Sequence, residues 1–425
     1  MIRHLAVLGF LLASAVGGLA ATRPVAVGAP GKPAVDTCTA CHVELDDQRL
    51  RAPATSAQSD ADVHHRQGVG CAACHGGDPT SNDAETAMSP AAGFVGRFAA
   101  TAIPEMCASC HANASFMLRY GPNIPTDQLD QYRTSRHGLA LARGDRRVAT
   151  CISCHGAHGV LPASDARSPV YPSRIVETCA RCHSDAALMQ RYGVSGNEPA
   201  DYRRSVHYAA LTQNNDLAAP TCNDCHGSHG ATPPGVSSIS NVCGSCHVTQ
   251  RERFDVSPHK DAFAALEQPA CETCHSNHAV LHPDDSWIGV GEEQVCGQCH
   301  ADDDAGGQAA AAIAATLAAS RAGLAAATGR VDRIERAGML MDEAKVRLEE
   351  AHQAYVLAQV EVHTADPAAV AAQTAQVRSG FDDAGRFAVE AEAEIRFRRT
   401  GLFISLGVIA LAMVALFLKV RQLER

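Results

Sequence analysis

The pattern Cys-x-x-Cys-His occurs nine times between Cys38 and His300, and the nine copies together use all eighteen cysteines of the chain. Two thiols at this spacing can form thioether bonds with the two vinyl groups of one porphyrin, and the histidine that follows can then bind its iron. Zinc sites place histidine at variable distances from cysteine, and disulfide frameworks require no histidine at all, so nine identical spacings favour haem over both alternatives. The sequence therefore predicts nine covalently bound haem c groups.

The residues of the nine motifs have two predicted roles. The cysteines that would form the thioether bonds are Cys38, Cys41, Cys71, Cys74, Cys107, Cys110, Cys151, Cys154, Cys179, Cys182, Cys222, Cys225, Cys243, Cys246, Cys271, Cys274, Cys296 and Cys299. The proximal iron ligands would be His42, His75, His111, His155, His183, His226, His247, His275 and His300.

The motifs recur in pairs within a longer repeat. Each full unit has a first motif, a Ser-x-His, and a second motif with a further histidine three residues after the motif histidine. The units cover residues 107–178, 179–242 and 243–295, after a degenerate unit at 36–106 and before a closing motif at 296–300. The array thus contains four pairs of motifs and one more.

A haem iron that only passes electrons needs a sixth ligand, because saturation keeps small molecules away from the metal. Histidines at repeating offsets are the natural supply. The candidate distal ligands are His64, His65, His137, His158, His207, His229, His259, His278 and His282. His64 and His65 are adjacent, and one of them need not bind iron. His282 has no counterpart in the repeat. A methionine such as Met88 or Met106, or an open site, therefore stays an alternative sixth position for one or two haems.

The two ends of the chain have the composition of export and membrane segments. Residues 1–21 combine a basic start, an apolar run and small residues before Ala21, as in a secretory signal peptide. Residues 400–418 carry no charge and are long enough to cross a bilayer as one helix, with basic residues on both sides. These features predict a domain at 22–300 on the exported, periplasmic side of a bacterial inner membrane and a cytoplasmic tail at 419–425.

Residues 301–399 are rich in helix-forming residues and contain one proline, Pro367. Apolar residues recur every seven positions, and Asp366-Pro367 is typical of a cap followed by a first-turn proline. The pattern predicts a helical hairpin or coiled-coil stalk with helices at 330–363 and 367–399 and a break near Thr328-Gly329. The stalk histidines, His352 and His363, are not assigned to iron.

Composition limits the fold class and the partners. Aromatic residues are only 4% of the chain, so side chains alone offer a thin core and the haems must fill it. We therefore expect a mainly α fold with extensive irregular loops packed on haems, followed by the helical hairpin and one C-terminal transmembrane helix. Residues 22–300 contain 29 acidic and 21 basic residues, a balance that argues against nucleic acid and allows steering of a basic redox partner.

The segments CISCHGAH to CARCH, CNDCHGSH to CGSCH and CETCHSNH to CGQCH resemble the doubled-CXXCH multihaem cytochrome c family of bacterial respiratory chains. The resemblance covers roughly residues 36–300 and implies bis-histidine ligation. The leading hypothesis is electron relay between a membrane or periplasmic donor, such as a membrane quinol dehydrogenase or another cytochrome, and a downstream acceptor. Bis-histidine ligation favours low potentials, which suit anaerobic respiration. The alternatives are a catalytic multihaem reductase or oxidase with one open iron, acting on a nitrogen or sulfur oxyanion, and a mainly structural subunit that joins an oligomer or complex through its stalk.

Overall fold

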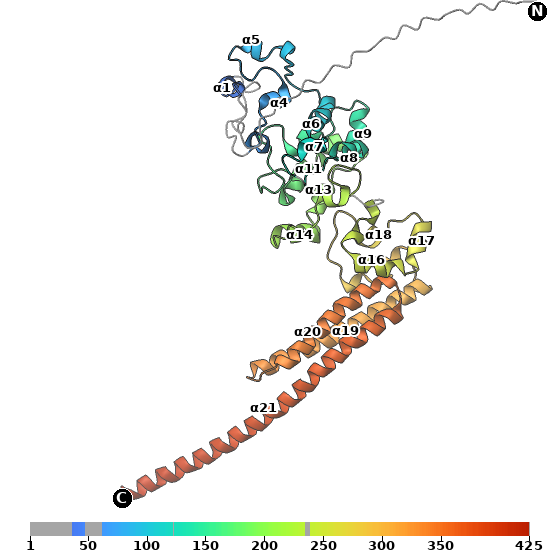
Figure 1. Ribbon diagram of the computed structural model, residues 1–425. Coiled ribbons are helices and arrows are strands. Elements are labelled where there is room, and N and C mark those ends of the chain that lie inside the picture. The colour runs from blue at the N-terminus through green and yellow to red at the C-terminus, as the bar shows by residue number, and fades with distance from the viewer. Residues whose placement is uncertain (1–35, 47–61, 122, 234–238, 425) are drawn as a thin grey trace, which may run out of the picture. The chain divides into compact units, whose positions relative to one another are not determined.

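The computed structural model describes residues 36–46, 62–121, 123–233 and 239–424 (Figure 1). The predicted signal peptide at 1–21 and the expected start near Ala21 lie outside these residues. The described residues form helices, turns and irregular segments without a β-strand, which confirms the mainly α fold class. They group into two compact units, one up to Arg174 and one from Ile175 onward.

The first unit consists of short helices joined by loops. Its elements are α1 (Cys38–His42), α3 (Val63–Arg66), α4 (Cys71–His75), α5 (Ala84–Ala87), η1 (Pro90–Ala92), η2 (Ala100–Ala102), α6 (Ile103–His111), α7 (Ala114–Met117), α8 (Gln128–Thr134), α9 (Arg136–Ala142), α10 (Cys151–His155) and η3 (Pro172–Arg174).

The second unit begins in the same way and ends in three long helices. Its short elements are α11 (Ile175–His183), α12 (Ala186–Gln190), α13 (Glu198–Tyr202), α14 (Val206–Gln213), α15 (Cys222–His226), η4 (Ile239–Asn241), η5 (Cys243–Ser245), α16 (Val248–Asp255), α17 (His259–Ala265), α18 (Glu272–His275), η6 (Asp285–Trp287) and η7 (Val295–Gln298). Its long helices are α19 (Ala305–Arg336), α20 (Asp342–Glu361) and α21 (Pro367–Leu423), with η8 (Val362–Thr364) before α21.

The apolar core of the described residues lies in the long helices. Two hydrophobic clusters, one around Leu317 and Val370 and the other around Val331 and Ala384, are built almost entirely by α19, α20 and α21. Between residues 36 and 300 the buried apolar side chains are few and scattered. This contrast agrees with the expectation that haem groups, rather than side chains, fill the core of the motif-bearing segments.

The stalk is a bundle of three helices, and the predicted break near Thr328-Gly329 is wrong. Thr328 Oγ1 donates a hydrogen bond to the carbonyl of Leu324, and α19 runs on to Arg336. The chain turns instead at Gly338, whose φ of 89° is a left-handed conformation that glycine adopts without strain. The predicted cap at Asp366 is confirmed, because its carboxylate accepts a hydrogen bond from the N–H of Ala368.

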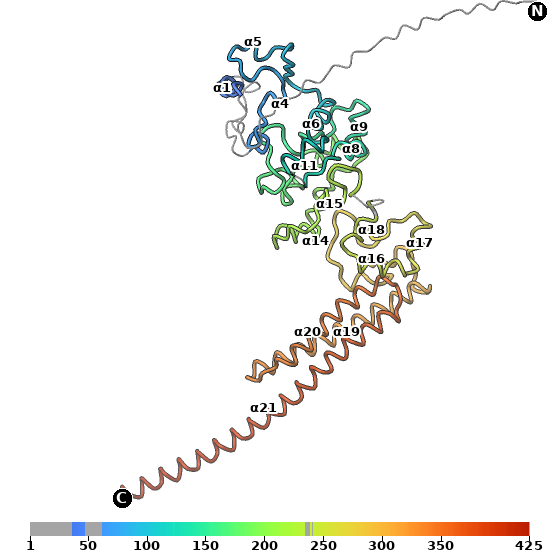
Figure 2. Tube along the Cα trace, viewed as in Figure 1, coloured from blue at the N-terminus to red at the C-terminus, as the bar shows by residue number. Residues whose placement is uncertain are grey.

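Helix α21 continues alone beyond the α19–α20 turn, as Figure 2 also shows. The apolar side chains of its segment 400–418 are exposed, from Leu402 to Leu418. This segment is long and apolar enough to cross a membrane. Helix α19 also passes that test of length and composition, but its Leu317 and Val331 are fully buried in the bundle.

Candidate haem-binding site

Most Cys-x-x-Cys-His motifs form a single helical turn. Four of them are the five-residue helices α1, α4, α10 and α15, and two more end the longer helices α6 and α11. Positions i, i+3 and i+4 of a helix lie on one face, so both thiols and the histidine of each such motif face the same side. All eighteen cysteines are at least partly exposed, with their sulfur atoms free of disulfide bonds. The motif geometry therefore suits attachment of one porphyrin to each turn.

Polar side chains fix the start of several motif helices. Thr150 and Thr221 form capping boxes with Ser153 and Asp224 at the N-termini of α10 and α15. In the degenerate unit, the carboxylate of Asp36 accepts one hydrogen bond from the Cys38 N–H (3.0 Å) and another from the Cys71 N–H (2.6 Å). One carboxylate thus holds both motif helices of that unit together.

Six motif histidines each face a histidine from outside the motifs. The ring centroids are separated by 6.0 Å in His64–His111, 6.1 Å in His75–His158, 6.3 Å in His207–His247, 5.9 Å in His226–His278, 6.1 Å in His259–His300 and 6.0 Å in His275–His363. Each pair contains one motif histidine and one histidine from outside the motifs. Five of the outside histidines are distal candidates, and the sixth is His363 of the stalk.

This spacing fits two imidazoles on opposite sides of one iron. A metal–imidazole bond is about 2 Å, and the bonded nitrogen lies about 1 Å from the ring centre, so the two centroids should be about 6 Å apart. No three His, Cys, Asp or Glu side chains gather into a site for a bare metal ion in the ranges that the structure describes. The residues present therefore fit a haem iron with two axial histidines.

Five of the paired rings have a lowered pKa, which favours the neutral form that binds a metal. Burial, followed by the positive charge that the facing imidazole would carry, lowers the pKa of His158, His226 and His275 below the ordinary histidine value. The same two causes lower the pKa of His207 and His259. A neutral imidazole keeps a lone pair for iron.

The pairs link one repeat to the next. In two repeats the histidine of the Ser-x-His position faces the motif that follows the repeat, in His207–His247 and His259–His300. The histidine three residues after a second motif faces the second motif of the preceding unit, as in His158–His75. In these five pairs the distal candidate faces a motif of a neighbouring repeat rather than of its own, which interlocks the repeats.

The serine of the Ser-x-His position has a structural role. Ser135 and Ser205 are buried N-cap residues whose hydroxyl oxygens accept hydrogen bonds from the N–H groups of Gly138 and Tyr208. The cap places the following histidine in the first turn of α9 or α14. Ser257 is also buried, and its hydroxyl donates to the carbonyl of Phe254.

The structure distinguishes His64 from His65. Asp62 replaces the serine as the N-cap of α3, and its carboxylate accepts hydrogen bonds from the N–H groups of both histidines. His64 is two residues after this cap, as in Ser-x-His, and its ring faces His111. The sequence Asp-x-His contained this signal, since aspartate and serine are equally good N-caps. In the described ranges, no ring contact joins His65 to another aromatic side chain.

Backbone hydrogen bonds hold distal candidates of the two kinds together. The N–H of Val63, next to His64, donates to the carbonyl of Val160, two residues after His158. The N–H of Val206, next to His207, donates likewise to the carbonyl of Val280, two residues after His278. Each of these two hydrogen bonds joins neighbouring repeats and positions two axial candidates for different haems.

Two histidines differ from the sequence expectation in their surroundings. His282 is exposed, and its Nδ1 lies 2.9 Å from the carbonyl oxygen of Pro283, while no ring contact joins it to another histidine among the described residues. His363, which sequence reasoning left out, faces His275 from η8. No repeat signal marks His363, because it lies 63 residues beyond the closing motif in the stalk.

The other predicted ligands stay predictions. His42, His155 and His183 in the motifs, and His137 and His229 among the distal candidates, all have interaction partners. His137 occupies the same repeat position as His207, and His229 the same as His158. Of the methionines considered as alternatives, Met88 is exposed at the end of α5.

Neighbouring motifs lie close together along the chain. The sulfur atoms of Cys107 and Cys151 lie within hydrogen-bond reach of each other. The same contact between first cysteines joins the two motifs of later units, in Cys179–Cys222 and Cys243–Cys271. Electrostatic contacts connect the second motif of one repeat to the first motif that follows it, in Cys74–Cys110, Cys225–Cys243 and Cys274–Cys296. Porphyrins attached to consecutive motifs would therefore be neighbours within residues 36–174 and again within residues 175–300.

Comparisons with known proteins agree with this site. The family model "Cytochrome c3" matches residues 217–301, and "Cytochrome c554 and c-prime" matches residues 26–76. The "C-type polyheme cytochrome OmcC" of Geobacter sulfurreducens is 25% identical over 228 residues, which are 49% of this chain and 28% of that protein. The "Multiheme cytochrome MtrA" of Shewanella baltica is 26% identical over 221 residues, which are 51% of this chain and 53% of that protein. No solved structure matches the chain significantly.

The attachment motifs, the facing histidines and the matched families define the class of protein. The chain belongs to the multihaem c-type cytochromes, whose families carry covalently bound haem. It spans about a quarter and about half of the lengths of the two curated relatives.

Proposed function

We propose that this protein is a membrane-anchored relay in which nine bis-histidine haems pass electrons between a donor and a downstream acceptor. The observation that carries the proposal is the set of six histidine pairs with centroids 5.9 to 6.3 Å apart. Two imidazole ligands saturate the iron, which favours electron transfer over catalysis and gives lower potentials than a histidine–methionine pair.

The order of the motifs supports a path through each of the two compact units. Consecutive motifs within each unit are joined by thiol contacts or electrostatic contacts, so haems attached there would follow the order of the chain. The haem would supply the redox chemistry when bound. The protein's part is to fix the separation of successive porphyrins and to tune each iron through its ligands, its burial and the nearby charges.

The long helix supports a defined position relative to a bilayer. From Pro367, beside the last repeat, to residue 400 the helix rises about 50 Å at 1.5 Å per residue. If segment 400–418 lies in the inner membrane with the haem domain on its periplasmic side, the haems stand well above the lipid. The redox partners are then proteins that reach the haem domain through the aqueous phase, including the exposed domain of a membrane quinol dehydrogenase or another cytochrome.

A reductive titration of the purified full-length protein tests the relay. Reduction is monitored by the absorbance of the haems. We expect it to be reversible and to occur in several steps at low potential, with every step recovered on reoxidation. Irreversible reduction, or a single step carrying only part of the haem, would contradict the proposal. Binding of carbon monoxide by the native ferrous protein would favour the alternative of a catalytic haem with an open iron.

A further inference from the structure

The stalk contributes one histidine to the haem-bearing segment. His363 lies in η8, the turn between α20 and α21, and its ring faces His275 of the CETCH motif with the centroids 6.0 Å apart. This distance equals those of the pairs that join two residues of the motif array. The CETCH motif would otherwise have no partner among the paired histidines described here.

The orientation of the two rings identifies the position that His363 occupies. The three pairs that involve a second motif are nearly parallel, with interplanar angles of 21° in His75–His158, 17° in His226–His278 and 21° in His275–His363. The three pairs that involve a first motif are inclined by 42° to 85°. His363 therefore has the geometry of the histidine that follows a second motif in the next repeat. After CETCH the next motif is the single closing one, and the stalk provides the ring instead.

The other nitrogen of His363 is already engaged. Its Nδ1 lies 2.9 Å from the carbonyl oxygen of Val360, so the Nδ1–H can donate to that oxygen and Nε2 keeps its lone pair. A backbone carbonyl on the second ring nitrogen is the usual support of a metal-binding histidine, since it fixes the tautomer and the ring orientation.

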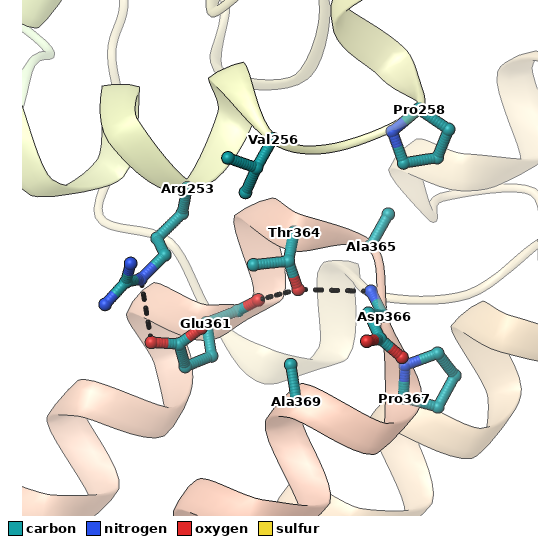
Figure 3. A pocket seen from close by; sticks show the side chains of 9 residues that line it. All are labelled: Arg253, Val256, Pro258, Glu361, Thr364, Ala365, Asp366, Pro367 and Ala369. Carbon is teal, nitrogen blue, oxygen red and sulfur yellow. Dashed lines mark hydrogen bonds and ion pairs between the residues drawn. The ribbon is translucent and has the colours of Figure 1, made fainter.

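Further contacts fasten the stalk around this histidine. Arg253 on α16 forms an ion pair with Glu361 at 2.8 Å, beside a cavity of about 580 Å³ at the same junction (Figure 3). Asp285, whose side chain is only 8% exposed, accepts hydrogen bonds from Tyr355 and from Gln359 on α20. These contacts hold the end of α20 against the last repeat, so η8 has a fixed place beside His275.

We propose that His363 is the sixth ligand of the iron attached at Cys271, Cys274 and His275, so that the stalk completes the haem chain. The inference rests on the proposed bis-histidine relay and assigns this ligand in place of His282. It makes the membrane stalk part of the redox site: α20 and α21 cannot leave the last repeat without breaking a bond to iron.

Replacement of His363 tests the assignment in the full-length haem protein. In His363→Ala we expect one of nine ferric irons to change from low-spin to high-spin by electron paramagnetic resonance, and the ferrous protein to bind one carbon monoxide. Added imidazole should restore the low-spin signal of that one iron. General unfolding would instead disturb the ligands of the other irons as well. His363→Met should keep the iron six-coordinate and raise the potential of one haem, which preserves a readout if the alanine variant does not mature.

Two matched variants serve as controls. His282→Ala removes the competing candidate, and His352→Ala removes an exposed histidine of the same stalk; both should leave every iron low-spin. A high-spin iron in His282→Ala together with an unchanged His363→Ala spectrum would overturn the inference. That result would leave the relay intact, because reversible multi-step reduction of the unaltered protein is measured independently.

Discussion

Asp62 is expected to hold two axial histidines of two different haems. One carboxylate oxygen caps α3 by accepting from the N–H groups of His64 and His65, at 2.8 and 3.2 Å. The other accepts from the N–H of Val160 at 2.9 Å, two residues after His158. Replacement by alanine removes the support of both ligands at once, so the irons of the His111 and His75 motifs should be perturbed together.

The expected loss of folding stability in Asp62→Ala follows from the two roles of the carboxylate, as the N-cap of α3 and as the acceptor of the Val160 N–H. Loss of an N-cap costs about 1 kcal/mol. A hydrogen bond to a charged acceptor contributes about 1.5–3 kcal/mol, and the Asp62 side chain is only 14% exposed, so solvent screens it little. Asp62→Ala should therefore lower the free energy of unfolding of the haem segment by about 2–4 kcal/mol. Asp62→Ser restores the Ser-x-His of the other repeats and should lose only the bond to Val160.

Denaturant unfolding followed by haem absorbance, together with spin-state measurements, separates these variants. Asp62→Ala should shift the midpoint most and disturb two irons, while Asp62→Ser should shift it less and disturb only the iron that faces His158. Asp78→Ala is a suitable control, because the Asp78 carboxylate accepts its hydrogen bonds from nearby Thr80. An Asp62→Ala protein with an unchanged midpoint and unchanged spectra would refute the reasoning.

Further substitutions test the stalk and the closing motif. Leu317→Ala, at a fully buried position of the bundle, should cost about 2–5 kcal/mol in denaturant unfolding, whereas the exposed Val346→Ala should cost almost nothing, and equal losses would contradict the three-helix core. Gly306→Ala would make a Cβ clash with Nδ1 of His300 in the closing motif and should alter the spectrum of one haem. Gly385→Ala has open space and should be neutral or slightly stabilising. A chain ended after Arg399 should move from the membrane fraction to the soluble fraction with its haem spectrum unchanged; retention in the membrane would argue against the anchor.

The sequence was a good guide where chemistry requires a fixed spacing. The attachment motifs and the paired arrangement of the repeats follow from short-range patterns, because thioether formation and proximal ligation depend on neighbouring residues. The helix start at Asp366-Pro367 was predictable for the same reason. The apolar segment of α21 was equally plain from composition.

The remainder depends on contacts between distant residues. Which motif each distal histidine faces is decided by interlocking of neighbouring repeats, as in His158–His75, and no local pattern contains that pairing. Two stalk helices of equal length were predicted, without the helix end before Gly338. Basic residues such as Arg333 and Arg336 shortly before a glycine are typical of a helix end. His363 was overlooked because its position beside His275 arises only when η8 packs against α16.

The most direct test of the account is the number and spin state of the irons in the full-length oxidised protein. Mass spectrometry should find nine haem groups per chain, and electron paramagnetic resonance should assign all nine irons as low-spin with no high-spin ferric signal. Fewer than nine haems, or a high-spin signal equivalent to one iron or more, would contradict a closed bis-histidine relay.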